Sequence, residues 1–275
     1  MDIKLIAVDL DGTLLNEDRI VSDKDKKALL DAMDNGIIVV PVTGRQLSGV
    51  RKALGGLFDS VRYIIAVNGA QIRDMQNNEM LFRTDISPEE AEEVYDYLDS
   101  LPVIYEAFQD EDVMMPSEHF ARFDEYSMRP GITGGLKAII KPIGDFRNVM
   151  KTERLSMVKI QALFNDPKLR LEQLEEIPRR FPNLLVTSAQ ANNIEISGKD
   201  ASKGSALKVL CAHLQIELKE AMAIGDNIND ISMLSLAGVS IAMGNASEDV
   251  CQGVTYVTGS NTESGVAEAI NKFAL

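Results

Sequence analysis

Residues 5–13 read LIAVDLDGT, an apolar run that passes directly into two acids separated by a leucine, then a glycine and a threonine. The apolar run predicts a buried strand, and the glycine predicts the turn that ends it.

Residues two apart in an extended chain point the same way, so the carboxylates of Asp9 and Asp11 are expected roughly 6–7 Å apart at about 3.3 Å per residue. Such close acids resist ionising together unless a cation joins them. Hard oxygen ligands favour Mg²⁺, which also holds phosphate oxygens. Paired acids at this spacing are also common in surface turns, so the interpretation depends on the rest of the chain.

The length and net charge of the chain limit the number of domains and the kinds of partner that we expect. The chain has 275 residues, more than the roughly 100–200 of one domain, so a second domain or a large insertion is expected. With 42 acidic and 28 basic residues the net charge is -14, which argues against nucleic acid and anionic membrane surfaces as partners. The two cysteines lack metal-ligand spacing and the first residues lack a secretion signal, so we expect a cytoplasmic protein. Nothing in the sequence indicates an oligomeric state.

Apolar runs and helical patterns alternate at both ends of the chain. Near the start, strands are expected at 4–8, 37–42 and 63–67, with helices at about 23–34 and 46–54. Near the end, helices are expected at about 203–214 and 228–237, with strands at 221–224, 239–243 and 254–257. This alternation is typical of βαβ units and a parallel sheet. The sequence therefore predicts an α/β protein with a Rossmann-like parallel-sheet core made of residues 1–83 and 195–275.

The middle of the chain has a different pattern. Residues 84–194 mix alternating strands, such as 103–108 and 158–163, with acidic helices, and we interpret them as an inserted α+β cap domain. Its first helix is expected to open with a capping box over 87–90, with proline at the first helical position. A hairpin around Asn77-Asn78 is expected to lead into the insertion.

Polar residues follow several of the predicted core elements. In an open parallel sheet, ligands bind beyond the carboxyl ends of the strands, so these positions belong together. After the second strand come Thr43, Gly44 and Arg45, which offer a hydroxyl, a glycine amide and a guanidinium at a helix N-terminus. Lys203 opens a helix, where a lysine is slightly unfavourable to the helix dipole. We interpret it as a cation that screens a carboxylate from a phosphate, although a solvated lysine is the usual alternative.

Residues 225–230 read GDNIND and follow the strand expected at 221–224. Asp226 is placed to complete the oxygen shell of a cation, Asn229 to donate to a phosphate oxygen, and Asp230 to orient ligands from behind. A turn rich in Asp and Asn that caps the helix near Ile228 would explain the segment equally well by itself.

Together, these motifs resemble the haloacid dehalogenase (HAD) superfamily. More narrowly, the chain is similar to the Cof-type phosphatases, in which a large α+β cap, the type IIB cap, is inserted between the second and third motifs. The resemblance covers the whole chain and is carried by residues 9–13, 43–45, 203–204 and 225–230, with 68–70 and 242–246 also typical. The motif residues show no departure from the family pattern, and the cap is matched by position and length.

The resemblance implies a role for each motif residue. Asp9 would be the nucleophile that takes the phosphoryl group, and Asp11 the acid that protonates the leaving oxygen and then activates water. Mg²⁺ would be held by the side chains of Asp9 and Asp226 and by the backbone carbonyl of Asp11. The transferring phosphate would be bound by Leu10 through its amide, Thr43, Gly44, Lys203 and Asn229. From the residues themselves, Arg45 and Asp230 are further candidates, either for orienting the groups of the site from behind or for contacting the substrate.

The predicted function is therefore a Mg²⁺-dependent phosphatase of small phosphorylated metabolites, either sugar phosphates or phosphorylated cofactors, acting through an aspartyl phosphate. One alternative is a phosphotransferase or phosphomutase that passes the phosphoryl group to another hydroxyl. A non-catalytic protein that binds phosphorylated metabolites is a further alternative. Cap residues should set specificity, and Met114, Met115 and Glu118 are candidates, although ordinary packing explains them as well.

Overall fold

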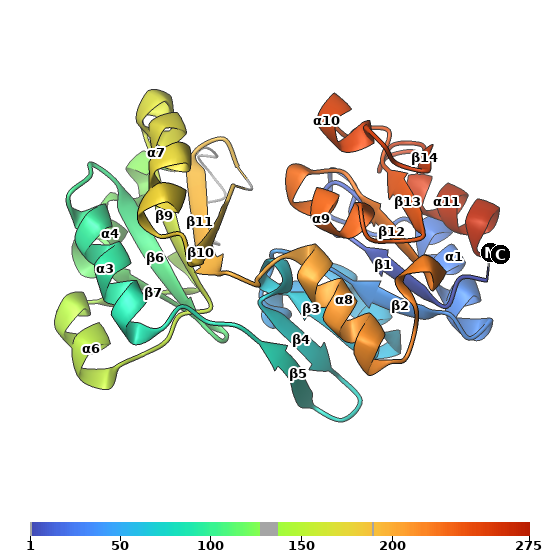
Figure 1. Ribbon diagram of the computed structural model, residues 1–275, viewed down its shortest axis with the longest axis horizontal. Helices are drawn as coiled ribbons and strands as arrows, with labels where there is room; N and C mark the ends of the chain where they lie inside the picture. Colours follow the sequence, from blue (N-terminus) through green and yellow to red (C-terminus); the bar gives the residue numbers. More distant parts are fainter. Residues whose placement is uncertain (1, 127–136, 189) are drawn as a thin grey trace. The chain divides into compact units, whose positions relative to one another are not determined.

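The computed structural model describes residues 2–126, 137–188 and 190–275, and the chain divides into two compact units (Figure 1). The core unit comprises residues 1–83 and 200–275, and the cap unit comprises residues 84–199. The second boundary lies after Lys199 rather than after residue 194. The reason is that β11 (Asn193–Gly198) stays paired with β10 (Leu184–Thr187) as far as Gly198, so the strand belongs to the cap sheet along its whole length.

A parallel five-stranded sheet with the order β14-β13-β12-β1-β2 forms the centre of the core unit. Its strands are β1 (Leu5–Val8), β2 (Ile38–Pro41), β12 (Ala221–Gly225), β13 (Val239–Ala242) and β14 (Tyr256–Val257). β1 lies between β2 and β12, with Leu5 opposite both Ile38 and Ala221. All four residues of β1 are buried, as expected for a parallel strand covered on both faces. The α/β fold with a parallel-sheet core is thus confirmed.

Helices cover the core sheet. They are α1 (Asp23–Asp34), α2 (Leu47–Leu54), α8 (Lys203–His213), α9 (Ile231–Leu234), α10 (Glu248–Cys251) and α11 (Gly265–Phe273), with 3-10 turns η1 (Gly55–Ser60), η2 (Val67–Gly69), η4 (Leu218–Glu220) and η5 (Ile228–Asp230). α1 packs against α11, and the amide of Ala267 donates to the buried carboxylate of Asp25 at 2.8 Å. α8 packs on the sheet through Leu207, which lies in one hydrophobic cluster with Leu5 and Ala7.

The third expected strand does not extend the parallel ladder. β3 (Tyr63–Ala66) instead forms an antiparallel sheet with β4 (Gln71–Asp74) and β5 (Glu79–Arg83), joined to β2 by a single bridge between Val42 and Ile65. Val42 donates its amide toward β1, and Thr43 donates its amide toward β3, so position 41 would also donate toward β3. Pro41 has no amide hydrogen, which leaves the β2–β3 ladder incomplete. The hairpin expected around Asn77-Asn78 is present between β4 and β5.

Two other expected elements are shorter than predicted. The helix expected at 228–237 is reduced to η5 and α9, which ends at Leu234. After Leu234 the chain leaves the helix through a turn, in which the amide of Leu236 donates to the carbonyl of Met233 at 3.2 Å, and the amide of Gly238 then donates to the carbonyl of Leu218 at 2.8 Å. The strand expected at 254–257 is only Tyr256–Val257, which pairs with Ile241 and Ala242 of β13, while the amide of Thr255 donates to the carbonyl and the hydroxyl of Ser240.

The cap unit is built on a six-stranded sheet with the order β10-β11-β9-β6-β7-β8, antiparallel except for the β7–β8 pair. Its remaining elements are α3 (Pro88–Asp99), β6 (Ile104–Gln109), β7 (Asp112–Pro116), α4 (Ser117–Arg122), η3 (Phe123–Tyr126), β8 (Ile140–Ile143), α6 (Phe146–Glu153), β9 (Lys159–Leu163) and α7 (Pro167–Arg180). The capping box is present, because the hydroxyl of Ser87 accepts from the amide of Glu90 and the Glu90 carboxylate accepts from the amide of Ser87. The mixed α+β cap is therefore confirmed.

Met114 and Met115 pack on opposite faces of β7. Met114 belongs to the larger cap cluster, which also contains residues of α3, α6 and α7, whereas Met115 belongs to a smaller cluster with Phe123 and Tyr126. Because neighbouring strand residues alternate between faces, the pair cannot line one ligand surface. Packing, the alternative reading of the sequence, explains both methionines.

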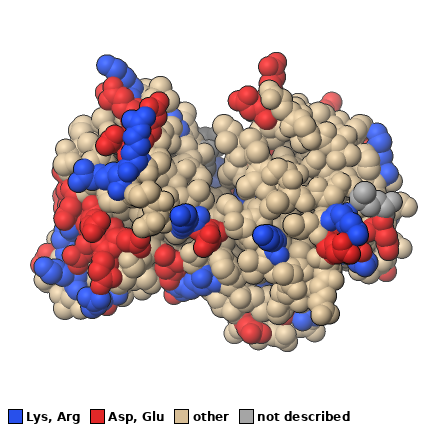
Figure 2. Space-filling model, in the orientation of Figure 1, with Lys and Arg blue, Asp and Glu red and all other residues tan. Residues whose placement is uncertain are grey.

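Acidic side chains gather on the cap over α3, as Figure 2 shows. Glu89 and Asp96 are exposed there and form ion pairs with Arg154 and Arg147, respectively. Such exposed pairs contribute little, about 0–1 kcal/mol each, so this face is best explained as a solvated surface. In the parts of the chain that the structure describes, no helix is both long and apolar enough to cross a membrane.

Candidate active site

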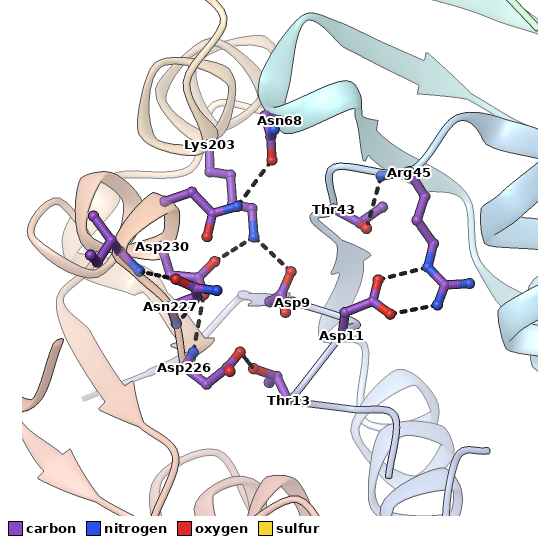
Figure 3. Close-up of polar contacts among 12 residues, drawn as sticks. Asp9, Asp11, Thr13, Thr43, Arg45, Asn68, Lys203, Asp226, Asn227 and Asp230 are labelled. Atoms are coloured by element: carbon purple, nitrogen blue, oxygen red, sulfur yellow. Dashed lines mark hydrogen bonds and ion pairs between the residues drawn. The ribbon is translucent and has the colours of Figure 1, made fainter. Parts of the chain in front are cut away.

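The core motifs meet at the carboxyl ends of β1, β2 and β12 and at the N-terminus of α8 (Figure 3). Asp9 follows β1, Thr43 follows β2 and Asp226 follows β12, while Lys203 is the first residue of α8. Neighbouring parallel strands end at the same edge of a sheet, which is where ligands bind in open α/β folds. The sequence pattern therefore located this edge of the core unit.

Lys203 lies between two acids. Its Nζ is 2.6 Å from Oδ1 of Asp9 and 2.5 Å from Oδ1 of Asp230. The three side chains are almost fully shielded from solvent, with Lys203 and Asp9 1% and 5% exposed. Burial by itself lowers the pKa of Lys203, but the carboxylates of Asp230 and Asp9 more than compensate and hold its pKa above the ordinary value, so it stays cationic.

The same burial disfavours the charged form of Asp9. Loss of solvent raises the pKa of Asp9 well above its ordinary value, Lys203 lowers it, and the neighbouring Asp230 raises it again. One ammonium thus faces two buried carboxylates, with Asp226 adding to the negative charge. A divalent cation would relieve this surplus.

Asp226 approaches Asp9 from β12. Side-chain oxygens of Asp9, Asp226 and Asp230 all lie within 4.8 Å of one another, an all-oxygen group that could hold a divalent metal ion. The hydroxyl of Thr13 donates to Oδ1 of Asp226 at 2.9 Å and fixes its orientation. Burial raises the pKa of Asp226 to about 6, with the Thr13 hydrogen bond lowering it and Asp230 raising it further.

Asp230 is occupied by donors rather than open to a ligand. Its Oδ2 accepts from the amides of Asp226 at 3.0 Å and Asn227 at 2.9 Å, while Oδ1 takes the ammonium of Lys203. A carboxylate with this many donors orients its neighbours. With both oxygens of Asp230 taken by these donors, Asp9 and Asp226 are the better placed candidates for metal ligands, and the orienting role of Asp230 stays a prediction.

Gly12 makes room for Asp226. It has a φ of +87°, and an added Cβ would lie 2.3 Å from Oδ2 of Asp226. The carbonyl of Gly12 also accepts from the side-chain amide of Asn245 at 2.8 Å. The turn after Asp11 is therefore fixed both by a conformation that favours glycine and by a contact more than two hundred positions away in the sequence.

Thr43, Gly44 and Asn229 lie around a second part of the site. The hydroxyl oxygen of the buried Thr43 accepts from the amide of Arg45 at 3.2 Å, which leaves its proton for another acceptor. Gly44 lies against Asn68, whose side chain would be 3.0 Å from an added Cβ. Asn229 donates to Oδ1 of Asn68 at 3.1 Å, so its amide is oriented by that residue. Leu10 is held in the turn because its carbonyl accepts from the amide of Leu15 at 2.8 Å.

Arg45 forms a bidentate ion pair with Asp11. Its Nε and Nη2 donate to the two carboxylate oxygens of Asp11 at 2.7 and 2.5 Å. This hydrogen bonding raises the pKa of Arg45, burial lowers it, and the charge of Asp11 raises it. The sequence placed both residues near the site, but gave no sign that they pair with each other.

Three polar residues of the site had no assigned role in the sequence analysis. Thr13 and Asn68 lie within quoted motif segments, so their positions were visible although their partners were not. Asn245 lies in the 242–246 segment, which looked typical of the family. Its contact depends on the meeting of two loops that are distant in sequence, which no local pattern reveals.

Comparison with known proteins agrees with this geometry. The family model for haloacid dehalogenase-like hydrolases matches residues 6–270. The chain belongs to this family. It is 31% identical over 275 residues to the 5-amino-6-(5-phospho-D-ribitylamino)uracil phosphatase YcsE of Bacillus subtilis, covering 100% of this chain and 97% of the relative.

Solved structures support the same assignment. A haloacid dehalogenase-like hydrolase from Bacillus subtilis has a TM-score of 0.82 and 31% identity, with 98% of this chain and 100% of that chain covered. A subclass IIB sugar phosphatase of the superfamily shares the fold at a TM-score of 0.81 and 23% identity, with 98% of each chain covered. The predicted family is thereby confirmed: the chain is a HAD hydrolase of the Cof type, of the phosphoric monoester hydrolase class, with an inserted α+β cap.

Proposed function

We propose that the protein is a Mg²⁺-dependent phosphatase that hydrolyses small phosphorylated metabolites through a phosphoryl group carried on Asp9. The observation that supports this most strongly is the buried contact between Asp9 and Lys203, at 2.6 Å, beside the carboxylate of Asp226. A buried carboxylate held by a cation and next to a candidate metal position is suited to attack a phosphate dianion, because both positive charges offset the repulsion between the reactants.

The all-oxygen donors of Asp9 and Asp226 fit Mg²⁺, with the Asp11 carbonyl as the third ligand that we propose. When bound, the ion would neutralise charge on the transferring phosphoryl group. Lys203 donates to Oδ1 of Asp9 and orients this carboxylate, of which one oxygen would contact the metal ion and the other would attack phosphorus.

The reaction then takes two displacements. In the first, an Asp9 oxygen forms a bond to phosphorus, the bond from phosphorus to the ester oxygen breaks, and Asp11 gives its proton to the departing alcohol. In the second, Asp11 takes a proton from water as that water attacks phosphorus, and the bond to Asp9 breaks to release phosphate. The Leu10 and Gly44 amides, the Thr43 hydroxyl and the Asn229 amide are the donors that we assign to the phosphate oxygens.

The substrate that we propose is a small phosphate ester. We infer a sugar phosphate or a phosphorylated cofactor, and because the Bacillus subtilis relative is named for a phosphorylated ribitylamino uracil, phosphorylated ribityl compounds belong to the first set to test. Transfer of the phosphoryl group to another hydroxyl is the alternative reaction, and it would require an added acceptor.

The deciding experiment is a phosphate-release screen over sugar phosphates, nucleotides, pyridoxal phosphate, flavin mononucleotide and phosphorylated ribityl compounds, with and without Mg²⁺. We expect metal-dependent release without an acceptor for at least one ester, and no release by Asp9→Asn, whose amide keeps the shape of the carboxylate but cannot act as the nucleophile. Ordinary turnover by Asp9→Asn would refute the proposal. Release that requires a second hydroxyl compound would favour the phosphotransferase.

A further inference from the structure

The ion pair between Arg45 and Asp11 is an unusual feature of the site. Both donors on one edge of the guanidinium, Nε and Nη2, meet both oxygens of the carboxylate at 2.7 and 2.5 Å. This is the two-pronged geometry that fixes orientation as well as charge, and that lysine cannot reproduce. Figure 3 shows the Asp11 carboxylate pointing toward Arg45, whereas Asp9 points toward Lys203.

Arg45 is the anchored partner of the pair. Its amide donates to the Thr43 hydroxyl at 3.2 Å, its carbonyl accepts from the amide of Val67 at 3.1 Å, and its Nη1 donates to the carbonyl of Gly49 at 3.4 Å. The Arg45 side chain is 22% exposed, whereas that of Asp11 is 54% exposed. A half-exposed aspartate would otherwise sample several rotamers, so the orientation of Asp11 is set by Arg45.

Two ordinary explanations are available for this arginine. An exposed ion pair contributes about 0–1 kcal/mol and often has no function, but bidentate geometry with a largely buried arginine is the exception to that rule. Arginine is also a usual phosphate ligand. Here its carboxylate-facing edge is already occupied by Asp11, and Lys203 stands beside Asp9 as the cation for the phosphate.

We propose that Arg45 is a positioning residue that fixes the place of the Asp11 side chain, and that one Asp11 oxygen leaves the guanidinium to carry the proton to the ester oxygen of the substrate. This inference rests on the proposed function and assigns Arg45 to proton delivery rather than to phosphate binding. Misplacement of the acid should then affect only substrates whose leaving group needs a proton. Correct placement of a general acid contributes about 10²–10⁴-fold.

The test compares two leaving groups. Wild type, Arg45→Met, Arg45→Lys and Asp11→Asn are assayed by kcat/KM, which reports the steps through release of the leaving group. One substrate is 4-nitrophenyl phosphate, whose phenolate leaves without a proton, and the other is an alkyl phosphate from the screen. For the alkyl ester we expect about a 100-fold loss or more in Arg45→Met and Arg45→Lys. For the nitrophenyl ester we expect changes of no more than about 3-fold.

A double variant and a surface control complete the design. Arg45→Met combined with Asp11→Asn should lose no more alkyl-ester activity than Asp11→Asn alone, because the arginine acts through the acid. Arg51→Met, which removes an exposed arginine from α2, the helix that follows Arg45, should match wild type.

The outcomes are separable from those of the proposed function. Equal losses on both esters would overturn the inference and assign Arg45 to the phosphate or to the fold. A faster Arg45 variant, or additive losses in the double variant, would overturn it as well. A wild-type enzyme that hydrolysed neither ester with Mg²⁺ would refute the proposed function, and this inference with it.

Discussion

At the scale of single residues, Lys203 is the charge on which the site depends. We expect Lys203→Met to destabilise the protein by about 3–5 kcal/mol, because it leaves the carboxylates of Asp9 and Asp230 buried without their cation. Hydrolysis should fall by at least about 100-fold, since a preorganised positive charge is lost. Denaturant unfolding and phosphate release measure the two effects.

Two further variants control this prediction. Lys208→Met removes an exposed lysine from the same helix and should change neither property. Adding Asp230→Asn to Lys203→Met removes one orphaned charge and should restore part of the stability. A Lys203→Met protein as stable as wild type would contradict the view that this ammonium neutralises buried acids.

Gly12 offers a second residue-scale test, with a matched control inside the chain. Gly12 and Gly36 both have positive φ, at +87° and +81°, so alanine strains the backbone at either position. Only at Gly12 would the new Cβ strike Asp226, since nothing lies within 4 Å of a Cβ at Gly36. We expect Gly12→Ala to need about tenfold or more Mg²⁺ for half-maximal activity, a change of the size seen when groups that orient metal ligands are altered.

The comparison with Gly36→Ala separates strain from contact. Gly36→Ala should lose stability by about 1 kcal/mol, yet keep the Mg²⁺ dependence of wild type. Identical Mg²⁺ dependence in the two alanine variants would show that a Cβ at position 12 does not displace the metal-binding carboxylate of Asp226.

At the scale of elements, the cap sheet carries a buried acid whose ionisation should weaken the fold. Burial raises the pKa of Glu106 on β6 to about 7, with Lys159 lowering it and Glu195 raising it. Between the unfolded value of about 4.5 and pH 7, the folded protein keeps a proton that the unfolded chain has lost, so stability decreases as pH rises through this range. Above pH 7 the full penalty applies, on the order of 3 kcal/mol.

Glu106→Gln removes the ionisable group but keeps an oxygen to accept from the side-chain amide of Gln161. We expect a smaller drop in melting temperature between pH 5 and pH 8 than in wild type. Glu153→Gln, at an exposed position on α6, should leave the wild-type pH dependence intact. An unchanged pH dependence in Glu106→Gln would show that this carboxyl does not titrate in that range.

The elements also show what local sequence can predict. β1 and its glycine turn were predictable because an apolar run ending in DLDG permits few alternatives. The small antiparallel sheet was not, because the pairing of β3 with β4 and β5 depends on contacts that form only in the folded chain. The early end of α9 was equally hidden, since the segment after it is bound by the carbonyl of Leu218, which accepts from the amide of Gly238 and is supplied only by the folded chain.

At the scale of the whole molecule, a chain of net charge -14 is proposed to accept an anion. At the strand ends Lys203 lies between buried acids and Arg45 is bound to Asp11, so carboxylates outnumber these two cations, and the proposed Mg²⁺ would supply the positive charge that an anion needs. The motif residues of this site were predictable because each follows a recognisable strand or opens a helix. The contacts of Thr13, Asn68 and Asn245 were not, because they join segments brought together only by the sheet order.

The most direct test of the account is to trap the phosphoryl group on the protein. Asp11→Asn lacks the base for the second displacement, whereas 4-nitrophenyl phosphate needs no acid for the first. Mixing them with Mg²⁺ and analysing peptides by mass spectrometry should show the added mass of one phosphoryl group on Asp9, absent from the Asp9→Asn/Asp11→Asn double variant. Release of nitrophenol with Asp9 unmodified and the group on another residue would contradict the account.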